Sequence, residues 1–268
     1  MTAGVNAPHN TKAATGIDAR VLTELVSPAL ATRMQVHGSI DSTQQVLLDT
    51  ASRCADRSWV VSTHQRAGRG RRGRRWVTPP DSALALSMLA HQPPTGRWQS
   101  AVSLALGVAV AEVVASLGAP AVQVKWPNDV WVQGRKLGGI LVESYAGGVV
   151  AGVGVNWQLD GAARALIDQP CIDLFDLGVS VSPEFLAAAL AEAWNQTFDR
   201  FARHGWAAFE ERWIGLDALS GKSVRLWTGA HEPLEGVACG VDARGALQVD
   251  IAGQLCHFSS AEVSVRTS

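Results

Sequence analysis

Apolar residues along this chain are spaced for two long helices. From Trp98 to Leu117 the sequence is rich in Ala, Val and Leu on nearly every side, which predicts a buried helix ending at Gly118. A second helix is predicted to begin at Ser182-Pro183-Glu184, where a capping residue precedes a proline. One face of this second helix carries the large apolar residues Leu190, Trp194, Phe198 and Phe201.

The rest of the pattern consists of shorter elements. Short helices are predicted from Ile17 and after the capping box formed by Ser42 and Gln45. Strands are predicted at 58–63, 83–89, 122–126, 130–132, 138–144 and 149–156. Connections between the later strands are too short for crossover helices, so antiparallel pairing is expected. From 220 to 266, short β-prone runs between Gly- and Asp-rich turns predict a small all-β barrel.

One segment concentrates positive charge. Residues 66–75, Arg-Ala-Gly-Arg-Gly-Arg-Arg-Gly-Arg-Arg, hold six arginines and three glycines, although the formal net charge of the chain is only −1. Guanidinium groups match carboxylate and phosphate geometry, and glycines let a backbone turn sharply or approach a ligand closely. The segment therefore predicts an anion-binding loop, and by itself it leaves the anion open.

Composition narrows the class of protein. With 47% apolar and 18% charged residues, the chain is globular and has ample material for a core. The four cysteines are scattered and lack metal-ligand spacing, which fits a reducing compartment. The sequence has neither the features of a signal peptide nor an apolar run long enough to span a bilayer. A cytoplasmic protein without membrane association is expected.

Three further segments combine glycines with polar residues: Lys125-Trp126-Pro127-Asn128-Asp129, residues 134–143 (GRKLGGILVE), and Gly152-Val153-Gly154-Val155-Asn156. Each segment also has a purely structural interpretation. Asn128 and Asp129 can serve a turn, Lys136 can be solvated, and the glycines of 152–154 can let two backbones pass closely.

Taken in order with Asp41-Ser42-Thr43 and with residues 65–73, these segments resemble the motifs of the biotin protein ligase family, over about residues 36–266. The resemblance implies an α+β fold. Its catalytic domain is of the class II synthetase-like biotin/lipoate ligase kind, with a mixed, largely antiparallel sheet and helices, and an SH3-like β-barrel follows. We expect a partly ordered leader at 1–33, the catalytic domain at 34–217 and the barrel at 218–268.

The resemblance implies a two-step reaction. The biotin carboxylate attacks the α-phosphate of ATP, and a lysine of a biotin carboxyl carrier protein, from acetyl-CoA carboxylase or a related carboxylase, then captures the biotinoyl-adenylate. Two anionic substrates repel each other, so cations are needed where they meet. Mg²⁺ is expected to arrive with ATP and to be held mainly by phosphate oxygens, because the sequence has no ligand-type cluster of His or Cys.

The resemblance also assigns the residues of the site, with no metal ligands among them. The biotin side is expected to be formed by Ser42, Thr43, Gln44, Gln65, Arg69, Gly70, Arg71 and Lys136. The ATP side is expected to be formed by Trp76, Asn128, Asp129, Lys136 and Asn156. Lys136 and Arg71 are expected to be the catalytic residues, whereas Lys125 and Glu143 are expected to support the site.

Two departures from the family pattern stand out. Gln44 replaces the Asn that many family members carry, which leaves open whether this side chain reaches biotin. Too few residues precede Ser42 for the winged-helix domain of the family's repressors, so a ligase without operator binding is expected. A weak homodimer through an exposed sheet edge is left open.

Two other classes of protein compete with this interpretation. Arginine-glycine clusters also bind single-stranded nucleic acid, but the near-neutral total charge and the lack of aromatic residues within the cluster argue against such a partner. A lipoate protein ligase would share the fold and the acyl-adenylate chemistry. The complete arginine-glycine loop and the KWPND segment favour biotin.

Overall fold

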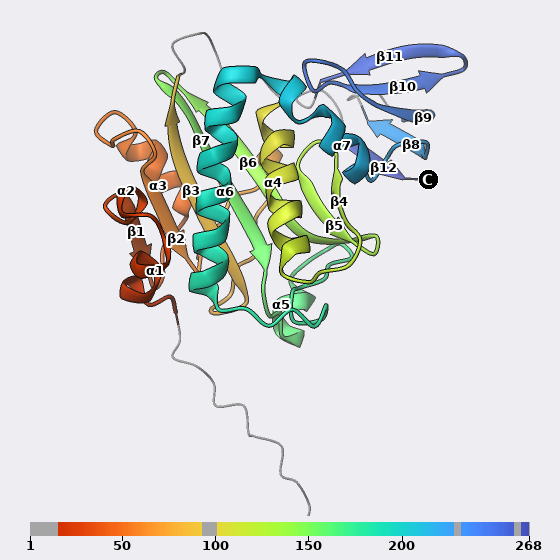
Figure 1. The fold of residues 1–268 in the computed structure, drawn as a ribbon. Helices are drawn as coiled ribbons and strands as arrows, with labels where there is room; N and C mark the ends of the chain where they lie inside the picture. Colours follow the sequence, from red (N-terminus) through yellow and green to blue (C-terminus); the bar gives the residue numbers. More distant parts are fainter. Residues whose placement is uncertain (1–15, 93–100, 228–231, 260–263, 268) are drawn as a thin grey trace, which may run out of the picture.

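The structure is a computed structural model that describes residues 16–92, 101–227, 232–259 and 264–267. Its centre is a seven-stranded sheet in the order β1-β2-β3-β7-β6-β5-β4 (Figure 1). The strands are β1 (Met34–His37), β2 (Trp59–Ser62), β3 (Ala83–His91), β4 (Val122–Lys125), β5 (Asp129–Val132), β6 (Arg135–Tyr145) and β7 (Gly148–Asn156). All neighbouring strands are antiparallel except β1 and β2, so the predicted mixed, largely antiparallel sheet and the α+β class are confirmed.

Two long helices cover one face of this sheet (Figure 1). They are α4 (Val102–Ser116) and α6 (Pro183–His204). The helix α4 ends as predicted, because Gly118 adopts a φ of +101° that favours glycine, while the predicted start at 98–100 lies outside the described residues. Ser182 caps α6, accepting a hydrogen bond from the Phe185 N–H. The indole of Trp194 on α6 packs 6.5 Å from that of Trp59 on β2, between ring centroids, deep in the core.

The remaining helices are short. They are α1 (Ala19–Leu25), α2 (Pro28–Ala31), α3 (Thr43–Thr50), α5 (Gly161–Ala165) and α7 (Glu210–Leu216), with 3₁₀ turns at Arg71–Gly73 and Trp206–Ala208. Residues 1–15 of the expected leader lie outside the described residues. Its later part belongs to the core, because Leu22 of α1 and Leu30 of α2 are fully buried. No described helix is both long and apolar enough to cross a membrane.

Side chains of β3 alternate in size and point to opposite faces of the sheet. Leu84, Leu86 and Met88 pack in the main core together with α4 and α6. Ala85 and Ser87, on the other face, lie opposite Gly154 and Gly152 of β7. The helices therefore cover a face of large residues, and the face with small residues is left to line a cavity.

The C-terminal residues form a second, antiparallel sheet in the order β11-β10-β9-β8-β12. Its strands are β8 (Ser223–Trp227), β9 (Leu234–Val241), β10 (Leu247–Ile251), β11 (Gln254–Phe258) and β12 (Ser264–Thr267). The predicted all-β character is confirmed. Within the described residues the edge strands β11 and β12 are not paired with each other, so this sheet is open where a closed barrel was expected.

Candidate functional site

A cavity of about 750 Å³ opens on the small-residue face of the main sheet. It gathers every residue that was assigned to the biotin side or the ATP side except Asn156. Those that line it are Ser42, Thr43, Gln44, Gln65, Arg69, Gly70, Arg71, Trp76, Asn128, Asp129 and Lys136. Residues that are up to 94 positions apart in the sequence therefore meet around one cavity. This convergence favours a binding site over the purely structural interpretations of the same motifs, because those interpretations do not require the residues to lie together.

Small residues make the floor of this cavity. A Cβ added at Gly152 would lie 2.6 Å from Gln44 Oε1 and 2.8 Å from Ser87 Oγ. A Cβ at Gly154 would run into the indole of Trp76. Both positions therefore require glycine, because any side chain would fill space that now belongs to the cavity and its walls.

Four buried, uncharged residues that line the cavity form what we call the polar corner: Ser42, Thr43, Gln44 and Gln65. The first turn of α3 builds it, with Ser42 as N-cap accepting from the Gln45 N–H. Gln65 Oε1 accepts hydrogen bonds from the Thr43 N–H at 2.8 Å and from Thr43 Oγ1 at 3.2 Å. This network holds donors and acceptors in place without any formal charge.

Gln44 completes the polar corner from the next position of α3. Its Nε2 donates to the Val150 carbonyl at 2.9 Å, and its Oε1 accepts from Ser87 Oγ at 3.3 Å. Thr43 Oγ1 lies 2.8 Å from the same Ser87 oxygen. Gln44, which is longer than the Asn of many family members, thus lines the cavity, and both its amide nitrogen and its amide oxygen are held by hydrogen bonds.

A cation also lines the cavity. Lys136 Nζ forms an ion pair with Asp129 Oδ1 at 2.8 Å, and only 15% and 20% of the two side chains are exposed. The ammonium also lies 5.5 Å from the ring centroid of Trp76, within the range of a cation–π contact. Lys136 is on β6 and Asp129 on β5, so paired strands fix the pair.

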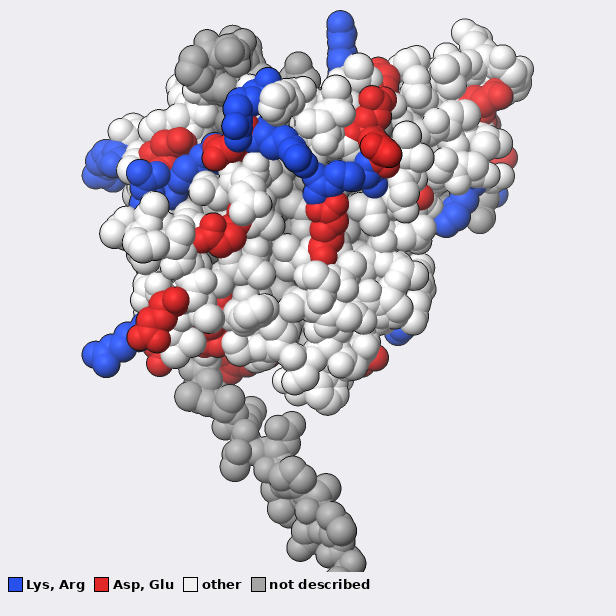
Figure 2. All heavy atoms as spheres, in the orientation of Figure 1, with Lys and Arg blue, Asp and Glu red and all other residues white. Residues whose placement is uncertain are grey.

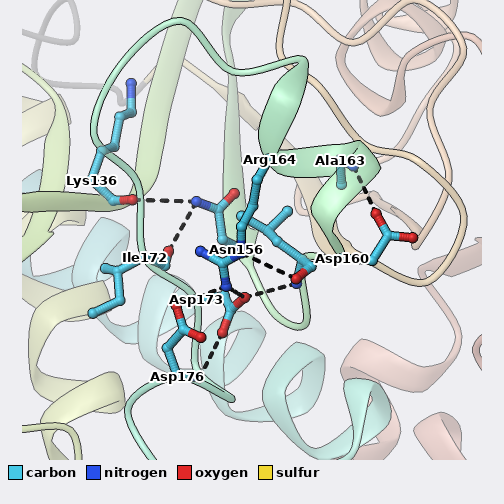
Figure 3. A network of polar contacts seen from close by, with 9 residues as sticks. Lys136, Asn156, Asp160, Ala163, Arg164, Ile172, Asp173 and Asp176 are labelled. Atoms are coloured by element: carbon cyan, nitrogen blue, oxygen red, sulfur yellow. Dashed lines mark hydrogen bonds and ion pairs between the residues drawn. The ribbon is translucent and has the colours of Figure 1, made fainter.

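Asn156, which was expected on the ATP side, is not among the residues that line the cavity and lies in the polar network of Figure 3. Its Nδ2 donates to the backbone carbonyls of Lys136, at 3.2 Å, and of Ile172, at 3.1 Å. The Ile172 N–H donates in turn to the Lys136 carbonyl at 3.0 Å. Asn156 therefore holds the backbone that carries Lys136. Its Oδ1 is buried and has no hydrogen-bond partner among the described residues.

A charged network that the sequence analysis did not identify lies next to Asn156 (Figure 3). Asp173, 1% exposed, accepts from the Leu159 and Asp176 N–H groups and from Arg164 Nη2, at 2.6–2.8 Å. Arg164 Nη2 also reaches Asp176, at 2.7 Å. The carboxylate is thus compensated on several sides, as a buried charge requires. The clustering of acidic residues with one arginine between 160 and 176 was the available signal.

The arginine-glycine loop, residues 66–75, runs along the rim of the cavity. Arg71 points to the KWPND turn, where its Nη1 lies 3.3 Å from Asn128 Oδ1. Burial lowers the pKa of the Arg71 guanidinium below its ordinary value, the charge of Arg72 lowers it further, and Asp129 opposes both effects. A partly buried cation beside other cations favours the approach of an anion.

Three other arginines of the loop, Arg66, Arg69 and Arg75, hold it in place through contacts with protein groups. Arg69 donates to Glu143 Oε1 of β6 at 2.6 Å and also contacts Gln45 Oε1 of α3. Arg66 pairs with Asp41 at 2.8 Å, and Arg75 donates to the Arg66 carbonyl. The guanidinium of Arg69, which was expected at the ligand, is therefore engaged with protein groups at the rim.

Glu143→Gln is expected to loosen the loop, because the amide keeps the shape but removes the charge that holds Arg69. An ion pair of this partly exposed kind contributes about 0.2–1 kcal/mol. Amide hydrogen exchange within 66–75 is therefore expected to speed up by roughly 1.5- to 5-fold. Glu235→Gln, which removes an ion pair with Arg225 on the C-terminal sheet, is the matched control. Unchanged exchange in Glu143→Gln would show that the pair does not hold the loop.

Comparison with known proteins agrees with this geometry. Residues 36–160 match the model of the "Biotin/lipoate A/B protein ligase family", and residues 219–266 match "Biotin protein ligase C terminal domain". The chain is 35% identical to the bifunctional ligase/repressor BirA of Escherichia coli over 234 residues, 85% of this chain and 73% of that protein. It is 32% identical to the biotin--[acetyl-CoA-carboxylase] ligase of Mycobacterium tuberculosis, over 86% of this chain and 88% of that one.

The fold agrees as well. A biotin protein ligase from Aquifex aeolicus, solved in complex with biotin and ATP, superimposes with a TM-score of 0.77 at 22% identity, covering 88% of this chain and 99% of that chain. The motifs, the fold and these sequence matches lead to one conclusion: the chain belongs to the biotin protein ligase family.

Proposed function

We propose that this cavity joins biotin to ATP as biotinoyl-adenylate and then passes the biotinoyl group to a lysine of a carrier protein. The observation that carries the proposal is the pairing of an uncharged polar corner with a cationic rim in one cavity. A neutral ring system with hydrogen-bonding groups suits the polar corner. A carboxylate and a phosphate suit Lys136 and Arg71.

In the first step, a biotin carboxylate oxygen bonds to the α-phosphorus of ATP, the bond from that phosphorus to the bridging oxygen breaks, and pyrophosphate leaves. Both reacting groups are anionic, so their approach is costly without nearby cations. Lys136 is held by Asp129 where the two ligands would meet, and its ammonium offsets the charge that builds up during the transfer. Trp76 and Asn128 would form the nucleotide side.

In the second step, a neutral lysine amine of the carrier attacks the acyl carbon, the acyl carbon–oxygen bond breaks, AMP leaves, and the amine loses a proton. The adenylate must be kept from water until then. The loop 66–75 at the rim is placed to do this. The M. tuberculosis and Paracoccus denitrificans relatives are named for acetyl-CoA carboxylase, which supports a biotin carboxyl carrier protein as the partner.

Mg²⁺ fits this site as a companion of ATP. No group of three His, Cys, Asp or Glu side chains lies together in the part of the chain that the structure describes, so phosphate oxygens would supply most of its ligands. The ion would offset phosphate charge. Asn156 contributes indirectly, because its hydrogen bond to the Lys136 carbonyl helps to position that lysine.

The contacts of the loop arginines favour a small-molecule and protein substrate over a nucleic acid. Figure 2 shows the face of the molecule that α4 and α6 cover, on the side of the sheet away from the cavity, where Lys and Arg side chains lie among Asp and Glu side chains. Three of the six arginines of the loop contact protein side chains: Arg66 pairs with Asp41, Arg71 contacts Asn128 and Arg69 pairs with Glu143. These contacts reduce the positive charge that the loop offers to a polynucleotide strand.

The function is tested with the purified chain, ATP, Mg²⁺ and a carboxyl carrier domain, offered either radiolabelled biotin or radiolabelled lipoate. We expect label from biotin on the carrier and none when the acceptor lysine is replaced by arginine. Transfer of lipoate without transfer of biotin would overturn the proposal.

Gly152→Ala is expected to weaken biotin binding, because the added methyl would crowd Gln44 Oε1 and Ser87 Oγ in the polar corner. Each hydrogen bond to biotin that the displaced groups no longer make costs about 0.5–1.5 kcal/mol, which corresponds to a roughly 2- to 13-fold higher Kd for biotin by calorimetry. Gly161→Ala is the control, since nothing lies within 4 Å of a Cβ there. Normal biotin affinity in a folded Gly152→Ala protein would move the biotin site away from this corner.

A further inference from the structure

A turn of the C-terminal sheet reaches the KWPND segment of the main domain. The turn, residues 242–246, joins β9 to β10. Its Gly245 carbonyl accepts a hydrogen bond of 3.0 Å from Trp126 Nε1, and the indole is only 1% exposed. Gly245 adopts a φ of +78°, and a Cβ there would lie 2.8 Å from Ala101 Cα, just before α4. The two domains thus meet in close backbone contact.

The turn is rigid in its own right. Asp242 Oδ1 accepts from the Arg244 N–H at 2.8 Å and from the Ala246 N–H at 3.0 Å, while its Oδ2 lies 3.0 Å from His257 Nδ1 on β11. Burial by itself would raise the pKa of Asp242, but these hydrogen bonds outweigh burial and lower it. A charged carboxylate therefore fixes the loop that presents the Gly245 carbonyl.

Trp126, which this turn holds, lies close in sequence to the cavity-lining residues Asn128 and Asp129. Trp126 directly precedes Pro127, whose carbonyl accepts from Ser103 Oγ of α4 at 3.3 Å. Asn128 contacts Arg71, and Asp129 holds Lys136. The segment 126–129 is therefore supported from α4 and from the C-terminal sheet on one side, and it holds both expected catalytic cations on the other.

We propose that Gly245 and its turn are positioning elements of the adenylation site: the C-terminal sheet fixes Trp126 and, through it, the side chains of Asn128 and Asp129. The inference rests on the proposed function and adds to it a task for the C-terminal sheet. The polar corner is built from α3 and from Gln65, away from this junction. Loss of the support should therefore affect ATP and the adenylation rate far more than biotin binding.

The test compares two glycines of the same sheet. Gly245→Ala places a methyl against Ala101, whereas Gly253→Ala, between β10 and β11, imposes a similar backbone cost at φ +86° with nothing within 4 Å of the added Cβ. We expect Gly245→Ala to lower kcat/KM for ATP in pyrophosphate exchange by roughly 10-fold or more, and to change the biotin Kd by less than about 2-fold. Gly253→Ala should leave both close to wild type.

A second variant guards against simple misfolding. Trp126→Phe removes the hydrogen bond and keeps a ring in place, so it should shift the ATP parameters in the same direction by a smaller factor. Because both changes break one contact, the double variant should lose no more than Gly245→Ala alone. Equal ATP defects in Gly245→Ala and Gly253→Ala, a parallel loss of biotin affinity, or additive losses in the double variant would overturn the inference. A wild-type protein that makes no biotinoyl-adenylate would instead overturn the proposed function.

Discussion

Lys136→Ala is expected to slow formation of biotinoyl-adenylate by roughly 100- to 1,000-fold, the usual loss when one electrostatic contact to the transition state is removed. The ammonium is held by Asp129 in the cavity, so its position is fixed before the ligands arrive. Its charge matters most when the carboxylate and the α-phosphate come together. Biotin affinity should therefore fall by much less, about 3-fold or below, because the polar corner is intact.

Lys125→Ala is the matched comparison for this result. Lys125 lines the same cavity but its Nζ lies 4.3 Å from the ring centroid of Trp131, so it carries the same charge in a different contact. Its loss should cost less in the adenylation rate. Stopped-flow or single-turnover measurement of adenylate formation, with calorimetry for biotin, separates the two effects. An equal loss of rate and of biotin affinity in Lys136→Ala would reduce Lys136 to a binding residue.

The elements that could be predicted from the sequence are those with strong periodic patterns. The buried helix α4, the amphipathic helix α6 and the strands β3 and β7 all follow from the spacing of apolar residues within each segment. The strand β1 was missed because its four residues are short, mixed in polarity and stabilised by a parallel partner, β2, that lies 25 residues away in register. Tertiary pairing of this kind leaves little trace in the local sequence.

The site shows the same division. The resemblance to the family assigned many of the residues that line the cavity, because their motifs are local runs of sequence that can be matched one residue at a time. The place of Asn156 was not predicted, since its role depends on where the segment around Ile172 folds back onto β6. The partners of Arg69 were equally hidden, because Gln45 and Glu143 approach from two different elements. Residues that position others depend on tertiary contacts, so composition and spacing do not identify them.

Arg71→Ala is expected to shorten the lifetime of the bound adenylate. Arg71 ties the loop to the KWPND turn through Asn128, and its partly buried cation lines the cavity. A hydrogen bond to a charged group contributes about 1.5–3 kcal/mol, so release or hydrolysis of biotinoyl-adenylate should speed up by roughly 10- to 100-fold. A single-turnover assay without carrier protein measures this lifetime directly.

Arg74→Ala is the control that separates the effect of the Arg71–Asn128 contact from the effect of positive charge in the loop. It removes the same unit of charge from the same loop but leaves Arg71 against Asn128. If the loop acts mainly as a lid fixed by Arg71, only Arg71→Ala shortens the lifetime. If general positive charge retains the adenylate, both variants shorten it alike, and rising salt reduces the difference between them and wild type. The first outcome makes the arginine-glycine loop a specific closure, in which one of its six arginines fixes the adenylate side and most of the others secure the loop itself.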